Sequence, residues 1–114
     1  MEKYRGVLTL PGEENPRQFD VLLDQENKNV IIKFETPVEG KIEWVGSSVQ
    51  MVQRMKYQEI IFTTSGFPKE GVDLTWKINA DLNNGTGAGV IVVRPNELRI
   101  SGEKGFTLVK NSDG

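Results

Sequence analysis

Two carboxylates within otherwise apolar stretches, Glu43 and Glu59, are the candidates in this chain for acid–base chemistry. A carboxyl group buried in a strand holds its proton more tightly than one in water, which suits it to proton transfer. Glycoside hydrolysis needs two such groups at a defined separation, which a sequence does not reveal. Carboxylates that face solvent are common on strands, so a carboxylate-based enzyme is a distant third hypothesis.

Other catalytic groups are missing from the composition. The 114 residues include no histidine and no cysteine. The usual general base near neutral pH, the commonest metal ligand and any thiolate nucleophile are therefore absent. We expect a protein that is not an enzyme and that holds no metal and no cofactor.

The run Gly85-Thr86-Gly87-Ala88-Gly89 is the motif closest to a phosphate-binding loop. Its spacing fits neither the dinucleotide fingerprint nor the P-loop, and it opens a strand rather than a helix. Glycines at alternate positions share one face of a strand, where a large side chain can lie across them. The preceding Asp81 does not begin a calcium loop either, because Val92 stands where that loop needs a carboxylate.

Charge argues against two classes of partner. The chain has 14 basic and 16 acidic residues, a formal charge of -2, and no apolar run long enough to span a bilayer. A protein that binds nucleic acid or an anionic membrane is expected to be basic. We therefore expect no nucleic-acid or membrane partner. The lack of cysteine fits a reducing compartment, so we expect a cytoplasmic location.

The elements that position these residues are strands. In residues 72–82, apolar side chains alternate strictly with polar ones, which predicts a strand with one buried face. Strands are likewise expected at 4–10, 17–24, 30–35, 41–45, 49–55, 57–64, 86–94, 97–101 and 106–110. A short helix is the alternative for residues 47–55. Asn84-Gly85 predicts a type I′ hairpin turn, and Glu103-Lys104-Gly105 predicts another turn.

Nine or ten short strands joined by short turns predict an all-β fold in one domain, residues 1–114. An antiparallel meander favours a small up-and-down barrel, since closure removes exposed edges. A two-sheet β-sandwich is the alternative.

The leading hypothesis is a non-catalytic binding or assembly module that engages a protein partner or its own copies. Ile60-Ile61-Phe62 and Val90 to Val93 are apolar on both faces, and a strand that is dry on both sides has to be covered by something. The residues predicted to bind this partner from the outer face are Ile60, Phe62, Ile91, Val93, Leu22 and Ile31.

The alternative hypothesis is a carrier that holds a small apolar or amphipathic ligand inside the barrel. A barrel of about ten strands is wide enough for a small ligand, whereas smaller barrels are filled by side chains. The residues predicted to line the interior are Trp44, Trp76, Phe19, Phe34, Met51 and Leu74.

Overall fold

The computed structural model describes residues 2–9, 14–36, 40–66, 73–81, 84–93 and 102–110. Within these ranges the chain is all-β, as the sequence predicts, and residues 47–53 form a strand rather than a helix. The nine strands are β1 (Glu2–Leu8), β2 (Arg17–Asp24), β3 (Asn29–Thr36), β4 (Gly40–Val45), β5 (Ser47–Gln53), β6 (Gln58–Ser65), β7 (Asp73–Asp81), β8 (Thr86–Val93) and β9 (Gly102–Lys110).

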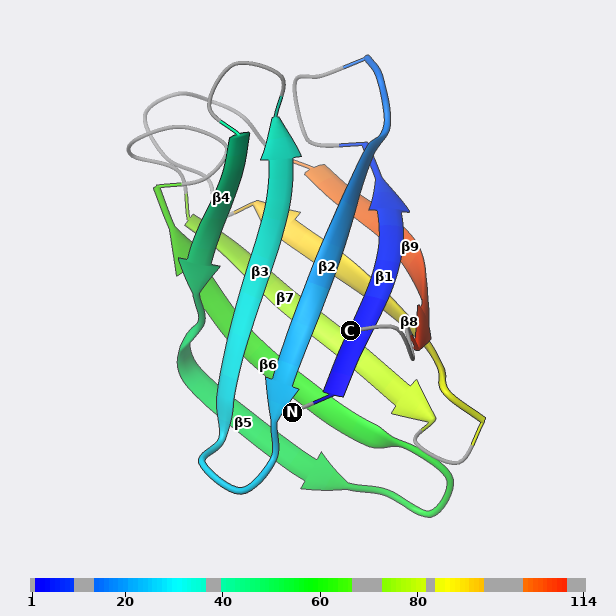
Figure 1. Cartoon of the computed structure of the whole chain (residues 1–114). Coiled ribbons are helices and arrows are strands. Elements are labelled where there is room, and N and C mark those ends of the chain that lie inside the picture. The colour runs from blue at the N-terminus through cyan, green and yellow to red at the C-terminus, as the bar shows by residue number, and fades with distance from the viewer. Residues whose placement is uncertain are drawn as a thin grey trace.

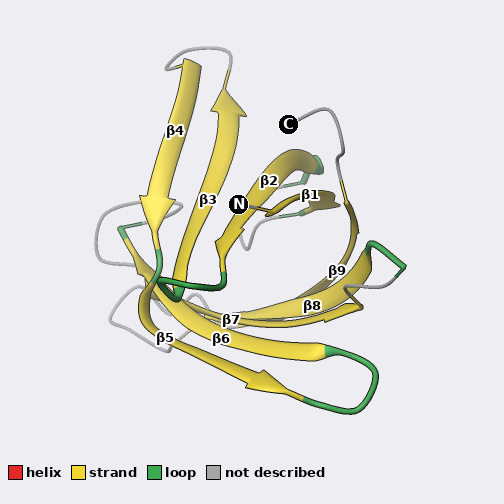
Figure 2. Cartoon of the chain, turned by 60° about the horizontal axis from the view of Figure 1, so that its bottom comes forward, coloured by secondary structure: helices red, strands yellow, loops and turns green. Residues whose placement is uncertain are grey.

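The nine strands form a single antiparallel sheet in the order β4-β3-β2-β1-β9-β8-β7-β6-β5 (Figure 1). The first and last strands pair, with Tyr4, Arg5 and Gly6 opposite Lys110, Val109 and Leu108. This pairing curls the meander into a nearly closed barrel, in which β1 to β4 face β5 to β9 across the interior (Figure 2). The predicted small barrel is confirmed.

Gly46 makes the corner where the chain passes from one side of the barrel to the other. Its N–H donates to the carbonyl of Val30 on β3 at 2.8 Å. The next residue, Ser47, is already paired with Thr63 on β6. A Cβ at position 46 would lie 2.8 Å from Cδ2 of Phe62, so glycine lets the corner pack directly on that ring. Gly46 therefore connects β4 and β5, the two ends of the sheet, and no ladder joins these two strands among the described residues.

Inward-pointing side chains fill the barrel, because every second residue of each strand faces the interior. In β7 the buried residues are Leu74, Trp76, Ile78 and Ala80, while those between them are exposed or half-buried. The pairs Phe19–Phe34, Val21–Ile32 and Leu23–Val30 are opposite one another in the β2–β3 ladder, and all six side chains are buried. The buried face predicted for residues 72–82 is confirmed within β7, and Phe19 and Phe34 face inward as predicted.

Two predicted turns differ in the structure. Asp81 pairs with Thr86, so four residues join β7 to β8 and the predicted two-residue type I′ turn is wrong. The side chain of Asp81 accepts hydrogen bonds from the N–H and side-chain amide of Asn84, which stabilises the longer loop. Glu103-Lys104-Gly105 is not a turn either: it continues β9, because β8 offers it a full ladder. The strand predicted at 97–101 lies outside the described residues.

Candidate functional site

Aromatic rings occupy the middle of the barrel and contact one another. Phe19 stacks on Phe34 with ring centroids 5.5 Å apart, and Phe62 stacks on Trp76 at 5.7 Å with 6° between the planes. Phe106 meets Phe19 edge-on at 5.2 Å. These five side chains are all buried. The rings of Phe19, Phe34 and Trp76, predicted to line a ligand cavity, are thus in contact with other rings of the core.

The remaining residues predicted to line the interior also face inward. Leu74 is fully buried, whereas Trp44 and Met51 are half-buried and pack against the core from the strands at the two ends of the sheet. Trp44 meets Phe34 edge-on, with ring centroids 6.1 Å apart. The six residues therefore share one face, and whether a ligand replaces any of their contacts remains a prediction.

Four of the residues predicted to bind a partner do not lie on the outer face. Ile60, Phe62, Ile91 and Val93 are at most 2% exposed and point into the barrel. The outer face of these strands is formed by the residues between them, including Ile61, Val90 and Val92, which are half-buried. Where both faces of a strand are apolar, alternation does not say which face is inner. Here the ladder with β7 decides it, because Ile60 and Phe62 pair with Ile78 and Trp76.

Leu22 and Ile31, the other two, do lie on the outer face. They are direct partners in the β2–β3 ladder, and Ile31 is in turn opposite Val45 on β4. Val45 is 67% exposed. Leu22, Ile31 and Val45 therefore form an apolar row that ends at the edge of the sheet.

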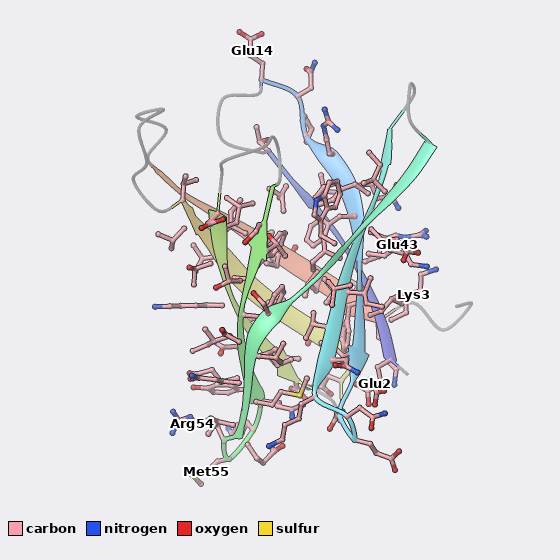
Figure 3. All side chains as sticks on the ribbon, turned by 90° about the vertical axis from the view of Figure 1, so that its left-hand side faces the viewer. Glu2, Lys3, Glu14, Glu43, Arg54 and Met55 are labelled. Atoms are coloured by element: carbon pink, nitrogen blue, oxygen red, sulfur yellow. The ribbon has the colours of Figure 1, made fainter. Side chains whose placement is uncertain are left out.

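The two carboxylates considered for catalysis both face solvent. Glu43 is about half exposed and its Oε1 lies 3.1 Å from Nζ of Lys33. Glu59 is 3.7 Å from the guanidinium of Arg54. Figure 3 shows Glu43 on the outside of the barrel, far from the turn that carries Arg54. Ion pairs of this exposed kind are ordinary surface features.

The run from Gly85 to Gly89 packs as predicted, with a large side chain lying across one of its glycines. A Cβ on Gly89 would lie 2.5 Å from Cζ of Phe106, so this ring lies across the glycine. Gly85 adopts a left-handed φ of 67° in the β7–β8 loop.

The spacing S-x-x-K occurs once, from Ser101 to Lys104, and our sequence reasoning missed it. Such a pair suits a serine nucleophile with a lysine base. Ser101 lies outside the described residues, and the chain is extended from Gly102 onward.

Three buried polar residues were also missed. Thr64 accepts a hydrogen bond from the indole Nε1 of Trp76, and Tyr4 and Gln58 are buried as well. Alternation would have revealed them: Gln58 and Thr64 continue the inner row of Ile60 and Phe62, and Tyr4 shares a face with Leu8.

The largest exposed apolar surface of the β5–β6 hairpin is at its tip. Met55 is fully exposed, and Val52 and Tyr57 are 42% and 38% exposed. Figure 3 shows Met55 and Arg54 at the end of the turn, pointing away from the barrel. This turn continues β5, the strand at one end of the sheet. Among the described strands β5 pairs only with β6, so a candidate protein interface combines this strand edge with apolar side chains.

No family model, no curated protein and no solved structure matches this chain. Among the described residues, no helix is long and apolar enough to cross a membrane. No group of three or more His, Cys, Asp or Glu side chains in the same ranges is arranged to hold a metal ion.

Proposed function

We propose that this protein is a non-catalytic β-barrel module that assembles with a second copy of itself through the edge of β5. The observation that carries the proposal is the composition of this edge: Ser47 to Gln53 contains no charged residue and no proline. Proteins usually protect exposed edges with charges, proline or bulges, because an unpaired strand recruits other strands. β5 has a bulge, but only at its start, where Ser48 adopts φ 52° and the register shifts.

The hydrogen-bonding pattern of β5 defines which groups a second copy would meet. The N–H of Arg54 donates to the carbonyl of Tyr57 at 2.8 Å, so it points toward β6. Backbone groups alternate in direction along an antiparallel strand. The N–H and C=O groups of Met51 and Gln53 therefore point away from β6, toward the open edge.

These groups determine the register of a symmetric dimer. Two copies of β5 run antiparallel about a two-fold axis when Met51 of each copy bonds with Gln53 of the other. Val52 then faces Val52 of the second copy across the axis, in the close, non-hydrogen-bonded type of pair. Arg54 falls opposite Gln50 of the second copy, so no like charges meet. The exposed Met55 lies beside Val49 of the other copy, which gives this side chain an apolar contact.

Light scattering over a concentration series tests the proposal. The unmodified chain should pass from monomer to dimer as concentration rises. Val52→Lys places two lysines opposite each other at the axis, where like charges repel, and should keep the chain monomeric. Gln53→Pro removes one of the outward N–H groups and should weaken the dimer, while leaving the β5–β6 ladder intact.

Ala88→Lys is the matched control, because Ala88 is exposed on β8, a strand paired on both sides. This variant should still dimerise. A chain that stays monomeric at every concentration, or a Val52→Lys variant that dimerises as well as the parent, would contradict the proposal. Loss of the dimer in Ala88→Lys alone would place the interface on the outer sheet face instead.

The carrier hypothesis requires a ligand to replace ring–ring contacts around Trp76. Stoichiometric quenching of tryptophan fluorescence by an apolar dye would support it. A cytoplasmic location, suggested by the lack of cysteine, also remains a prediction, which imaging of a tagged chain would test.

A further inference from the structure

A row of alternating charges crosses the outer face of the barrel from β1 to β4. The residues that lie opposite one another in this row are Arg5, Asp20, Lys33 and Glu43. Nε of Arg5 lies 3.0 Å from Oδ1 of Asp20, and Nζ of Lys33 lies 3.1 Å from Oε1 of Glu43. Opposite charges on neighbouring strands stabilise a sheet, and like charges destabilise it. The row ends on Glu43, a half-exposed carboxylate on the last strand at this end of the sheet.

The neighbouring residues of β4 leave apolar surface at the same edge. Val45 ends the apolar row of the outer face and is largely exposed. Trp44 packs against the core but is only half-buried, whereas its ladder partner on β3, Ile32, is fully buried. The difference follows from position, because β3 has a strand on each side and β4 pairs only with β3 among the described strands.

The backbone of β4 offers hydrogen-bonding groups along this edge. The N–H of Gly46 donates to the carbonyl of Val30 at 2.8 Å, so it points toward β3. Backbone groups alternate in direction along an antiparallel strand. The N–H and C=O groups of Val45 and Glu43 therefore point away from β3, at the end of the sheet that β4 forms in Figure 2.

Charge complementarity selects the strand that fits this edge. A strand that continues the alternation places a cation opposite Glu43 and apolar side chains opposite Trp44 and Val45. Residues 31–33 of β3 meet these same three residues in this way from the other side, with the sequence Ile-Ile-Lys. We propose that the edge of β4 binds an extended peptide, antiparallel to it, in which two apolar residues precede a lysine or arginine. A charge at a strand edge deters unselective pairing, so Glu43 also rejects acidic strands.

The probe for this inference is an acetylated, amidated peptide with the sequence of residues 29–34, added to the full-length protein. The peptide contains no tryptophan, and Trp76 is already buried, so a blue shift of the protein emission reports that Trp44 has been covered. The amides of Glu43 and Val45 should gain protection from hydrogen exchange. The same peptide with glutamate in place of lysine should bind about three- to tenfold more weakly, because like charges then face each other.

Reversal of the charge on β4 separates this site from general adhesion of an apolar peptide. Glu43→Lys should weaken binding of the lysine peptide and strengthen binding of the glutamate peptide by similar factors. Glu59→Lys is the matched control, because Glu59 also lies beside a cation, Arg54, but on β6, which is paired on both sides. This variant should leave both affinities unchanged.

The two peptides compared on the unmodified chain decide the matter even if Glu43→Lys fails to fold. Equal affinities of the two peptides, or no blue shift with the lysine peptide, would overturn the proposal. Binding that Gln53→Pro abolishes and Glu43→Lys leaves unchanged would overturn it as well, since the peptide would then lie on β5. Loss of the concentration-dependent dimer in Glu43→Lys would mean that a second copy, and not a peptide, occupies the edge of β4.

Discussion

The indole Nε1 of Trp76 donates a hydrogen bond to the hydroxyl of Thr64 at 2.9 Å, and both residues are buried. Trp76 is on β7 and Thr64 is on β6, two positions along the ladder from the partner of Trp76, Phe62. The largest side chain of the core therefore has its single polar group satisfied inside the barrel. This pair fixes the orientation of the indole ring that stacks on Phe62.

Thr64→Val should lower the free energy of unfolding by about 1–3 kcal/mol, because the buried indole N–H loses its partner while the volume of the side chain is kept. Urea denaturation followed by tryptophan fluorescence measures the change. Thr63→Val is the control, since Thr63 is the neighbouring residue on the outer face and should be nearly neutral. Equal stability of the two variants would mean that the hydrogen bond contributes nothing.

Gly89→Ala should destabilise the fold by about 1–3 kcal/mol, the usual cost of overpacking. The added Cβ would lie 2.5 Å from Cζ of Phe106 and 2.7 Å from the carbonyl of Lys77. The double variant Gly89→Ala with Phe106→Leu should recover part of the stability lost in Gly89→Ala alone. Gly105→Ala, whose Cβ would meet nothing closer than 3.8 Å, should be neutral or slightly stabilising in the same thermal melt. An alanine tolerated equally at both positions would be incompatible with the ring lying across Gly89.

Two hairpins of the barrel have connecting loops of four residues, and the last residue of each loop has a left-handed backbone conformation. Asp24 pairs with Asn29 around Lys28 at φ 53°, and Asp81 pairs with Thr86 around Gly85 at φ 67°. A left-handed conformation is strained for any residue except glycine. Lys28→Gly should therefore stabilise the chain by up to about 1 kcal/mol, and Gly85→Ala should destabilise it by about 1–3 kcal/mol. Urea denaturation of both variants measures these changes in the free energy of unfolding, which should have opposite signs. A destabilised Lys28→Gly variant would show that the left-handed backbone at Lys28 is not strained.

Stability should fall in alkaline solution because of Tyr4. Its pKa is raised from 10.0 to about 12 in the folded chain, so the folded state keeps a proton that the unfolded state releases. The resulting stabilisation is complete below pH 10 and is lost as the pH rises from 10 to 12, in total roughly 2–3 kcal/mol. Tyr4→Phe should flatten this decline in unfolding experiments at a series of pH values. The same slope with and without the hydroxyl would assign the decline to other groups.

Strict alternation of apolar and polar residues along the chain made most of the fold predictable. Residues 72–82 have only one apolar face, so the inward position of Trp76 followed from the sequence. For β6 and β8, both faces are apolar, and we assigned Ile60, Phe62, Ile91 and Val93 to the wrong one. Only the register with β7 settles that choice, and a sequence does not give register when the connecting loop has no recognisable turn type.

The candidate sites were less predictable, for a different reason. The outer row of Leu22 and Ile31 was found because these residues belong to consecutive strands joined by a short hairpin. The electrostatic interaction of Tyr4 with Asp81 joins β1 to β7, more than seventy positions further along the chain. No local pattern reports an approach over that distance, because it results from closure of the whole barrel.

Pairing of β1 with β9 also constrains how the barrel is made. β1 leaves the ribosome well before β9, so it has to wait for β9 before its second edge is paired. During that interval β1 and β8 each offer a bare row of amide and carbonyl groups to any neighbouring chain. Slow synthesis of β9 would lengthen this exposure, and crowded nascent chains would be most prone to associate during it.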